Sequence, residues 1–123
     1  MTTIMKKKKK RINTHRKGRL LERLVKLQLE REGFAVELTK WSRFANKDFF
    51  NLWDGIALSH DKTILFQVKS ASVSVEKYVE FLKNHCTDDV EGRLYIHSKK
   101  SRFRVIAFNS TGKVVELNDG GKR

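Results

Sequence analysis

The sequence is poor in acidic residues, has one cysteine, and contains no proline, no internal repeat and no long apolar run. Because Cys86 has no partner, an internal disulfide is excluded and a reducing, intracellular setting is expected. No apolar stretch approaches the roughly 20 residues needed to cross a bilayer. No apolar segment follows the basic N-terminus as it would in a signal peptide. We therefore expect a soluble protein with no membrane partner.

The shortage of acids leaves a strong positive charge. There are 27 Lys and Arg against 14 Asp and Glu, a net charge of +13, and residues 1–26 alone hold 11 basic side chains and the single acid Glu22. Such an excess favours a polyanion partner through counterion release. Alternatively, the run from Lys6 to Arg11 is a solvated tail that aids solubility. A membrane surface is the weaker alternative, because no lipidation signal accompanies the run.

The length of 123 residues indicates one domain with a real hydrophobic core. We expect a basic flexible arm over residues 1–12, a folded domain over 13–118, and a flexible tail over 119–123. Hydrophobic periodicity predicts two helices and six strands in the domain. The helices are expected at 13–32, ending before Gly33, and at 75–85. The strands are expected at 34–38, 54–58, 63–69, 93–97, 102–108 and 113–117.

This order of elements predicts an α/β fold with a central mixed sheet flanked by helices. The first helix carries one broad apolar stripe, made of Leu20, Leu21, Leu24, Val25, Leu27 and Leu29. The strand at 63–69 is apolar on both faces, with Ile64, Phe66 and Val68 on one side and Leu65 on the other. A strand of this kind is expected beneath helices.

Asp54 interrupts an otherwise apolar strand of the predicted hairpin. A buried carboxylate without a partner costs several kcal/mol, so Asp54 should face a cation. One interpretation is an ion pair with Lys69 across the hairpin. The other is a catalytic site, because Gln67 and Lys69 are two residues apart and share a strand face, and Glu22 lies on the preceding helix. Glu22 could instead form an i,i+4 pair with Lys26.

The catalytic interpretation assigns a role to each residue. Mg²⁺ takes hard oxygen ligands and keeps several waters, so Asp54, the Gln67 amide oxygen and the Val68 carbonyl are candidate ligands, with Mn²⁺ expected to substitute. Glu22 would bind a second ion or orient water. Lys69 would stabilise charge on the scissile phosphate or help to deprotonate the attacking water.

Basic residues around these elements are candidate contacts for nucleic-acid phosphates. They are Lys17, Arg19, Lys40, Lys47, Lys99, Lys100 and Arg102. The last three, together with Arg104, could instead merely solvate a hairpin tip. Four aromatic residues, Trp41, Phe44, Phe49 and Phe50, could stack on exposed bases or anchor a core or dimer interface. Phe81 and Phe108 are further candidates for an apolar contact between copies.

The ordered set of Glu22, Asp54 and Gln67-Val68-Lys69, on an α-β-β-β-α-β order, resembles the PD-(D/E)XK nuclease superfamily. Within it, the chain is most similar to the archaeal-type Holliday junction resolvases. Lys17-Gly18, Glu22-Arg23, Gly33-Phe34-Ala35-Val36 and Val68-Lys69-Ser70 carry this resemblance, which covers about residues 15–110. Two positions depart from the usual pattern: Gln67 replaces an acid, which should weaken metal affinity, and Trp53 replaces a proline.

The resemblance implies a restriction-endonuclease-like core and a small homodimeric, Mg²⁺-dependent endonuclease that cuts four-way DNA junctions by paired nicks. It assigns Glu22, Asp54, Gln67 and Lys69 to the active site, and brings Arg23, Ser42 and Arg43 to the phosphate backbone. Two alternatives stay open. One is a nuclease of the same fold acting on nicks, flaps or duplex DNA, and the other is a non-catalytic DNA-binding protein.

Overall fold

The computed structural model describes residues 14–39, 48–50, 52–71, 73–98 and 102–117. Helix α2 spans Thr14–Arg31 and helix α3 spans Glu76–His85. The strands are β1 (Ala35–Leu38), β2 (Gly55–Leu58), β3 (Thr63–Lys69), β4 (Val90–His97), β5 (Phe103–Phe108) and β6 (Val114–Leu117). The predicted arm over 1–12, the predicted tail over 119–123 and most of the loop before β2 lie outside the described residues.

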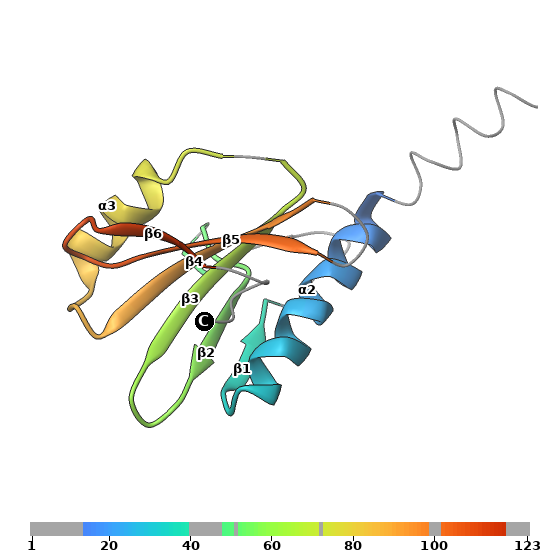
Figure 1. Ribbon diagram of the computed structural model, residues 1–123, viewed down its shortest axis with the longest axis horizontal. Helices are drawn as coiled ribbons and strands as arrows, with labels where there is room; N and C mark the ends of the chain where they lie inside the picture. The colour runs from blue at the N-terminus through green and yellow to red at the C-terminus, as the bar shows by residue number, and fades with distance from the viewer. Residues whose placement is uncertain (1–13, 40–47, 51, 72, 99–101, 118–123) are drawn as a thin grey trace, which may run out of the picture.

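The six strands form one sheet in the order in which they occur along the chain (Figure 1). All neighbours are antiparallel except β3 and β4, which are parallel. Parallel neighbours need a crossover connection rather than a tight turn, and α3 provides it. The predicted α/β class with a central mixed sheet is therefore confirmed.

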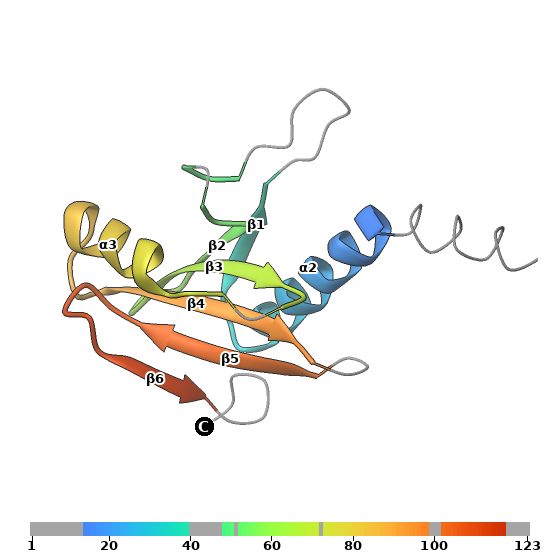
Figure 2. The same ribbon diagram turned by 90° about the horizontal axis from the view of Figure 1, so that it is seen from above.

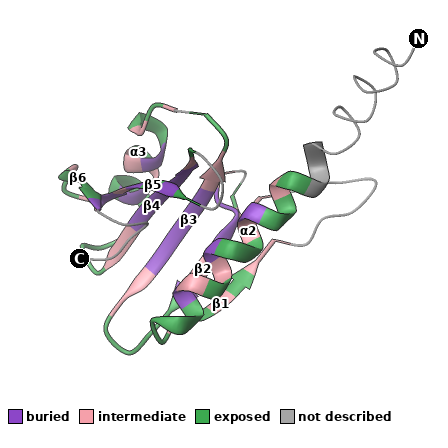
Figure 3. Cartoon of the chain, turned by 45° about the vertical axis from the view of Figure 1, so that its right-hand side comes forward, coloured by how far each residue is buried: buried purple, intermediate pink, exposed green. Residues whose placement is uncertain are grey.

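The two helices cover opposite faces of the sheet. Ile64 and Phe66 of β3 join the core cluster that contains the buried residues of α2, whereas Leu65 joins the cluster that contains those of α3. Strand β3 is buried over most of its length (Figure 3). The arrowheads of β3 and β4 point toward the side of the molecule where α2 begins (Figure 2). A polar residue late in β3 is thus placed at one end of the sheet, near the first half of α2.

Helix α2 buries only half of the apolar stripe that the sequence predicts. Leu21, Val25 and Leu29 recur at four-residue spacing and are at most 7% exposed against the sheet. The other half of the stripe is exposed by 54% at Leu20, 40% at Leu24 and 49% at Leu27. The broad stripe is thus divided into a buried and an exposed part, because a helix lying on a sheet buries only one face.

Two smaller expectations fail. Phe108, a candidate for contact between copies, is 2% exposed and packs in the α3 cluster, and Phe81 is partly buried against the same cluster. The turn expected at 88–92 is shorter, because β4 already begins at Val90, where it pairs with Thr63. Parallel pairing with the long β3 extends β4 beyond what its own apolar pattern indicates.

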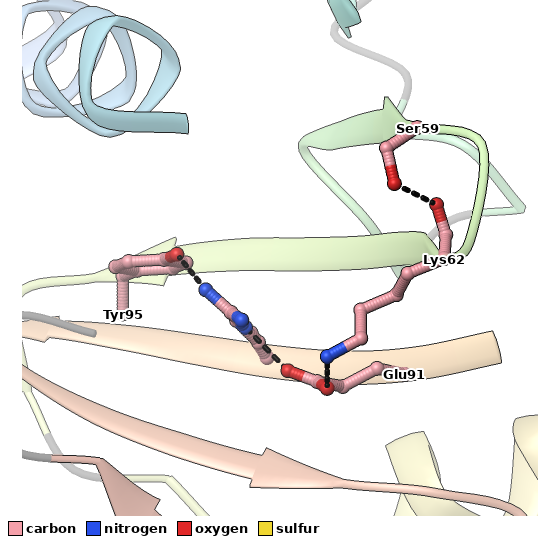
Figure 4. Close-up of polar contacts among 5 residues, drawn as sticks. Ser59, Lys62, Glu91 and Tyr95 are labelled. Atoms are coloured by element: carbon pink, nitrogen blue, oxygen red, sulfur yellow. Dashed lines mark hydrogen bonds and ion pairs between the residues drawn. The ribbon is translucent and has the colours of Figure 1, made fainter. Parts of the chain in front are cut away.

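A polar network lies between β3, β4 and the hairpin turn at 59–62 (Figure 4). The buried Arg93 guanidinium donates to Glu91 Oε2 at 2.5 Å and to the Tyr95 hydroxyl at 3.0 Å. Lys62 Nζ lies 3.0 Å from Glu91 Oε1. Burial opposes ionisation of Glu91, but hydrogen bonds and charge from Arg93 and Lys62 outweigh it and lower the pKa of this carboxyl. The network therefore compensates the buried guanidinium.

Removal of the Glu91 carboxylate should destabilise the fold. Glu91→Ala leaves Arg93 buried without its anion and is expected to cost about 3 kcal/mol of unfolding free energy. The matched control is Glu116→Ala, because Glu116 pairs with Arg104 at 3.1 Å while both side chains are about half exposed. The control should cost less than about 1 kcal/mol. Urea denaturation at pH 7 measures both, and equal losses would contradict this account of the network.

Candidate functional site

Asp54 lies where β1, β2 and β3 adjoin, and three hydrogen bonds hold it. The Thr39 N–H donates to the Asp54 carbonyl at 2.9 Å, and the Asp54 N–H donates to the Phe66 carbonyl at 2.8 Å. The Val68 N–H donates to the carboxylate Oδ2 at 2.8 Å. The residue is 6% exposed. Asp54 is therefore a rigidly placed, buried carboxylate at the end of the sheet.

The next residue, Gly55, lets the strands approach at this point. A Cβ atom on Gly55 would collide with the ring of Phe66, its pairing partner on β3. Phe66 is fully buried in the α2 cluster and cannot move away without disturbing that cluster. A glycine after Asp54 is thus required by packing, and it keeps β2 in register with β3.

Gln67 lies on β3 beside Asp54. The Phe66 carbonyl accepts the Asp54 N–H and the Val68 N–H donates to the Asp54 carboxylate, so backbone groups on both sides of Gln67 bond to Asp54. Gln67 follows Leu65 by two residues, and Leu65 belongs to the cluster that α3 covers. Gln67 is 5% exposed, and its amide oxygen has no hydrogen-bond partner among the described residues. An unsatisfied buried acceptor costs about 1–3 kcal/mol. The buried pair of Asp54 and Gln67 therefore offers oxygen atoms to a cation or a donor.

Asp48 also belongs to this site, although sequence reasoning did not select it. Phe49 and Trp53 form an antiparallel bridge, with N–H to carbonyl distances of 2.8 and 3.0 Å. This pairing brings Asp48 opposite Asp54, and their carboxyl groups share a hydrogen bond. The tight bend that makes the bridge includes Phe50 with a φ of 55°. Nothing in the local pattern predicts that bend, and only the presence of an acid near Asp54 could have pointed to Asp48.

The carboxyl groups at this end of the sheet influence one another. Burial raises the pKa of Asp54 to about 7, against the lowering effect of the Val68 N–H, and the nearby Glu22 and Asp48 charges raise it further. Burial, followed by Asp48, also raises the pKa of Glu22, while Arg19 lowers it. The structure therefore brings Glu22, Asp48 and Asp54 into one electrostatic cluster. Such perturbed groups are typical of functional sites.

Tyr78 of α3 borders the same cluster. Its hydroxyl pKa is raised by burial and then by the charges of Asp54 and Asp48. Its ring packs edge-on against Trp53, with centroids 5.2 Å apart. The indole Nε1 of Trp53 is the other buried polar atom in the described part of the chain that lacks a hydrogen-bond partner. The packed rings of Tyr78 and Trp53 thus lie on one side of the carboxylates.

The structure does not form either of the ion pairs that the sequence allowed. Within the described residues Asp54 makes no ion pair with Lys69, and Lys26 pairs at 3.9 Å with Glu30 rather than with Glu22. Lys69 is the partly buried last residue of β3, two positions after Gln67. Asp54 and Glu22 therefore do not form the ion pairs with Lys69 and Lys26 that would have given them a purely structural role.

The other predicted site residues are placed as follows. Val68 contacts the Asp54 carboxylate through its N–H. Lys17, Arg19 and Arg23 are exposed on the first half of α2, and Arg102 is exposed just before β5. The remaining predicted DNA contacts lie outside the described residues; they are Lys40, Ser42, Arg43, Lys47, Lys99 and Lys100. Residues 40–47 connect Thr39 with Asp48, and both of these adjoin Asp54.

The residues that the structure gathers fit a hard divalent cation. No set of three or more His, Cys, Asp and Glu side chains within the described ranges is arranged to hold a metal ion. Mg²⁺ does not need such a set, because one or two carboxylates with further oxygen ligands and water suffice. Asp54, Asp48 and the unpartnered Gln67 oxygen supply that combination. Glu22 influences the pair electrostatically from α2.

Comparison with known proteins adds no family to this description. No protein-family model matches the chain, and no curated protein matches it. The likeness to PD-(D/E)XK nucleases thus stays a resemblance carried by the ordered motif. Among the described residues, no helix is long and apolar enough to cross a membrane.

Proposed function

We propose that this protein is a Mg²⁺-dependent DNA endonuclease with a restriction-endonuclease-like core, which resolves four-way junctions by paired nicks. The observation that carries the proposal is the buried Asp54, held by the Val68 N–H beside the buried Gln67, whose amide oxygen has no partner among the described residues. The order of α2, the antiparallel β1–β2–β3, α3 and the parallel β4 supports the proposed core. The net charge of +13 supports a polyanionic substrate.

In this mechanism Asp54 and Gln67 would hold the cation with their side-chain oxygens. The chemistry supplied by a bound Mg²⁺ would be polarisation of the phosphoryl group and activation of water. The Val68 N–H keeps the Asp54 carboxylate in position. Lys69, at the end of β3, places a positive charge beside the scissile phosphate, and Glu22 accepts a hydrogen bond from the attacking water.

DNA contacts in this proposal come from α2 and from the basic segments around it. Lys17, Arg19 and Arg23 project from the first half of α2, near the end of the sheet that holds Asp54. Paired nicks in a two-fold symmetric junction require two active sites, so the proposed enzyme is a homodimer. The exposed Leu20, Leu24 and Leu27 form the largest group of exposed aliphatic side chains on one described element, and this supports a second copy.

The proposal is tested by cleavage of a labelled four-way junction with Mg²⁺, with Mn²⁺ and with EDTA. We expect paired nicks with either metal, no product with EDTA, and much slower cutting of linear duplex at equal salt. Faster cutting of nicked or flapped DNA than of the junction would support the other nuclease activity that the fold allows. Absence of any product with either metal would contradict an endonuclease.

A second candidate function is DNA binding without catalysis. It is favoured by Gln67, because a neutral amide replaces the acid of the usual motif and provides no charge to hold a cation. This candidate predicts salt-dependent junction binding and no cleavage with any divalent metal. A product band that disappears when EDTA is added would exclude it.

Phosphate contacts from α2 should be visible in the salt dependence of DNA binding. Lys17→Ala combined with Arg23→Ala removes two exposed cations, and each lost phosphate contact lowers the slope of log K against log salt by about 1. Fluorescence anisotropy between 50 and 200 mM salt, as a rough range, gives this slope. Lys113→Ala, at an exposed residue just before the edge strand β6, is the control and should leave the slope unchanged. Equal slopes for the double variant and the control would show that Lys17 and Arg23 of α2 do not contact DNA phosphates.

A further inference from the structure

Asp54 has an oxygen-bearing neighbour on each side. Toward β3, its N–H donates to the Phe66 carbonyl and its carboxylate accepts from the Val68 N–H, so it lies beside the intervening Gln67. On its other side the bridge between Phe49 and Trp53 brings Asp48 opposite Asp54. The two aspartates share a hydrogen bond between their carboxyl groups. Three side chains from three separate stretches of the chain thus converge on one point.

The charges of these side chains explain why the third one matters. Asp54 together with a neutral amide provides a single negative charge to a divalent cation, whereas hard cations are held by carboxylates wherever the site is tight. Asp48 raises the available charge to two. It is partly buried, and the bridge between Phe49 and Trp53 holds it beside Asp54, with which it shares a hydrogen bond.

An independent observation shows that these carboxylates surround a ligand position. The Gln67 side chain is 5% exposed and its oxygen has no hydrogen-bond partner in the described part of the chain. By strand alternation this side chain lies on the face of Leu65, in the cluster that also contains Tyr78, and the charge of Asp54 acts on Tyr78. A buried acceptor beside two carboxylates is satisfied by a cation and not by another protein acceptor.

We propose that Asp48 is a ligand of the divalent cation together with Asp54 and Gln67, and that its carboxylate supplies the charge that Gln67 lacks. This inference rests on the proposed function, since it concerns the same site. Asp48 is chosen over Glu22 as the compensating group, because Glu22 acts on Asp54 through its charge whereas Asp48 also shares a hydrogen bond with it. Asp48, just before the bend that leads to β2, therefore supplies the negative charge that the usual motif has at the position of Gln67.

The test is a Mn²⁺ titration of the full chain, with free Mn²⁺ measured by electron paramagnetic resonance. Asp48→Asn should weaken Mn²⁺ binding by about 10- to 100-fold, the loss that perturbed metal sites typically show. Asp54→Asn should weaken it at least as much. Asp61→Asn is the matched control, because Asp61 is an exposed carboxylate in the turn between β2 and β3. It should bind Mn²⁺ as the parent does.

Rescue distinguishes a ligand from a structural residue. Adding Gln67→Glu to Asp48→Asn restores the second charge from β3, and should return Mn²⁺ affinity to within about 3-fold of the parent, a strong coupling between the two positions. Circular dichroism in EDTA checks that each variant is folded. A folded Asp48→Asn variant that Gln67→Glu does not rescue would contradict charge replacement.

The failure of this inference differs from the failure of the proposed function. Parent-like Mn²⁺ affinity in Asp48→Asn, with affinity lost in Asp54→Asn, would overturn the role of Asp48 and leave the nuclease site standing. Parent-like affinity in Asp54→Asn would instead overturn the site on which the proposed function depends. Weaker binding in both aspartate variants, with rescue by Gln67→Glu, supports both proposals.

Discussion

Asp54→Asn should abolish Mg²⁺-dependent cleavage of a four-way junction while junction binding survives. The substitution removes the buried Asp54 carboxylate, which is one of the two negative charges that the proposed site offers to a cation. It leaves the exposed basic residues of α2 in place. We expect a loss of at least about 1,000-fold in the single-turnover rate, at the upper end of what removal of one charge-stabilising group costs. Quenched-flow cleavage and gel-shift binding, measured side by side, test this.

Two companion variants sharpen the result. Lys69→Ala should lower the rate by about 100- to 1,000-fold but leave Mn²⁺ affinity unchanged, because the lysine acts on the phosphate and not on the ion. Asp61→Asn, in the exposed turn of the same hairpin, should cleave as the parent does. Normal cleavage by both Asp54→Asn and Lys69→Ala would refute the proposed site.

The same Asp54→Asn substitution should stabilise the metal-free protein at pH 8. Burial raises the pKa of Asp54 to about 7, whereas an aspartate in an unfolded chain has its ordinary value of 3.8. A group whose pKa is raised by folding favours the folded state below its unfolded pKa, and this contribution is lost as the pH rises through the folded pKa. At pH 8 the parent therefore carries an ionised, buried Asp54 beside other carboxylates. Asparagine removes that charge, and its amide can donate to Asp48.

The expected gain at pH 8 is on the order of 3 kcal/mol, which corresponds to a rise in Tm of roughly 10 °C for a chain of this length. The gain should shrink toward zero near pH 4, where the folded parent keeps Asp54 protonated. Added Mg²⁺ should raise the Tm of the parent and not that of the variant, because only the parent binds the ion. Thermal denaturation in EDTA at pH 4, 6 and 8 measures the trend. A variant less stable than the parent at pH 8 would contradict a strained, buried carboxylate.

These two expectations have one physical cause. The ionised Asp54 destabilises the metal-free fold because it is buried among other carboxylates. The same surroundings make it a strong cation ligand. Stabilising substitutions that remove function are expected where a site is held in an unfavourable electrostatic state. By contrast, Glu91 is a partly buried carboxylate with its cations already in place, and its removal should only destabilise.

The periodicity of side chains along the chain was enough to predict most of the secondary structure. Strand β3 spans the predicted residues 63–69, and its neighbours Leu65 and Phe66 face opposite helices as expected. Helix α2 ends before Gly33, whose φ of +98° suits a residue that terminates a helix. These features depend on interactions between residues close in sequence, and a local pattern records such interactions directly.

The sequence also determined which residues of the hairpin could meet. Because side chains alternate along a strand, the sequence places Gln67 and Lys69 on one face of β3, and the Asp54 carboxylate accepts a hydrogen bond from the Val68 N–H between them. The sequence could not determine whether Asp54 pairs with Lys69 or stays without a lysine, since both outcomes leave the same alternation of apolar residues. Only the folded chain shows a carboxylate held by the Val68 N–H and not by the lysine.

Contacts between segments were decided by tertiary structure alone. Leu24 and Val25 are neighbours with the same local pattern, yet one is 40% exposed and the other fully buried, because the sheet covers a single face of α2. Asp48 meets Asp54 only because a bend through Phe50 folds the chain back on itself. The sequence by itself thus determined the strands, the helices and which side chains of β3 share a face. The backbone path between strands and the position of each helix on the sheet decided the rest, because both depend on packing between residues distant in sequence.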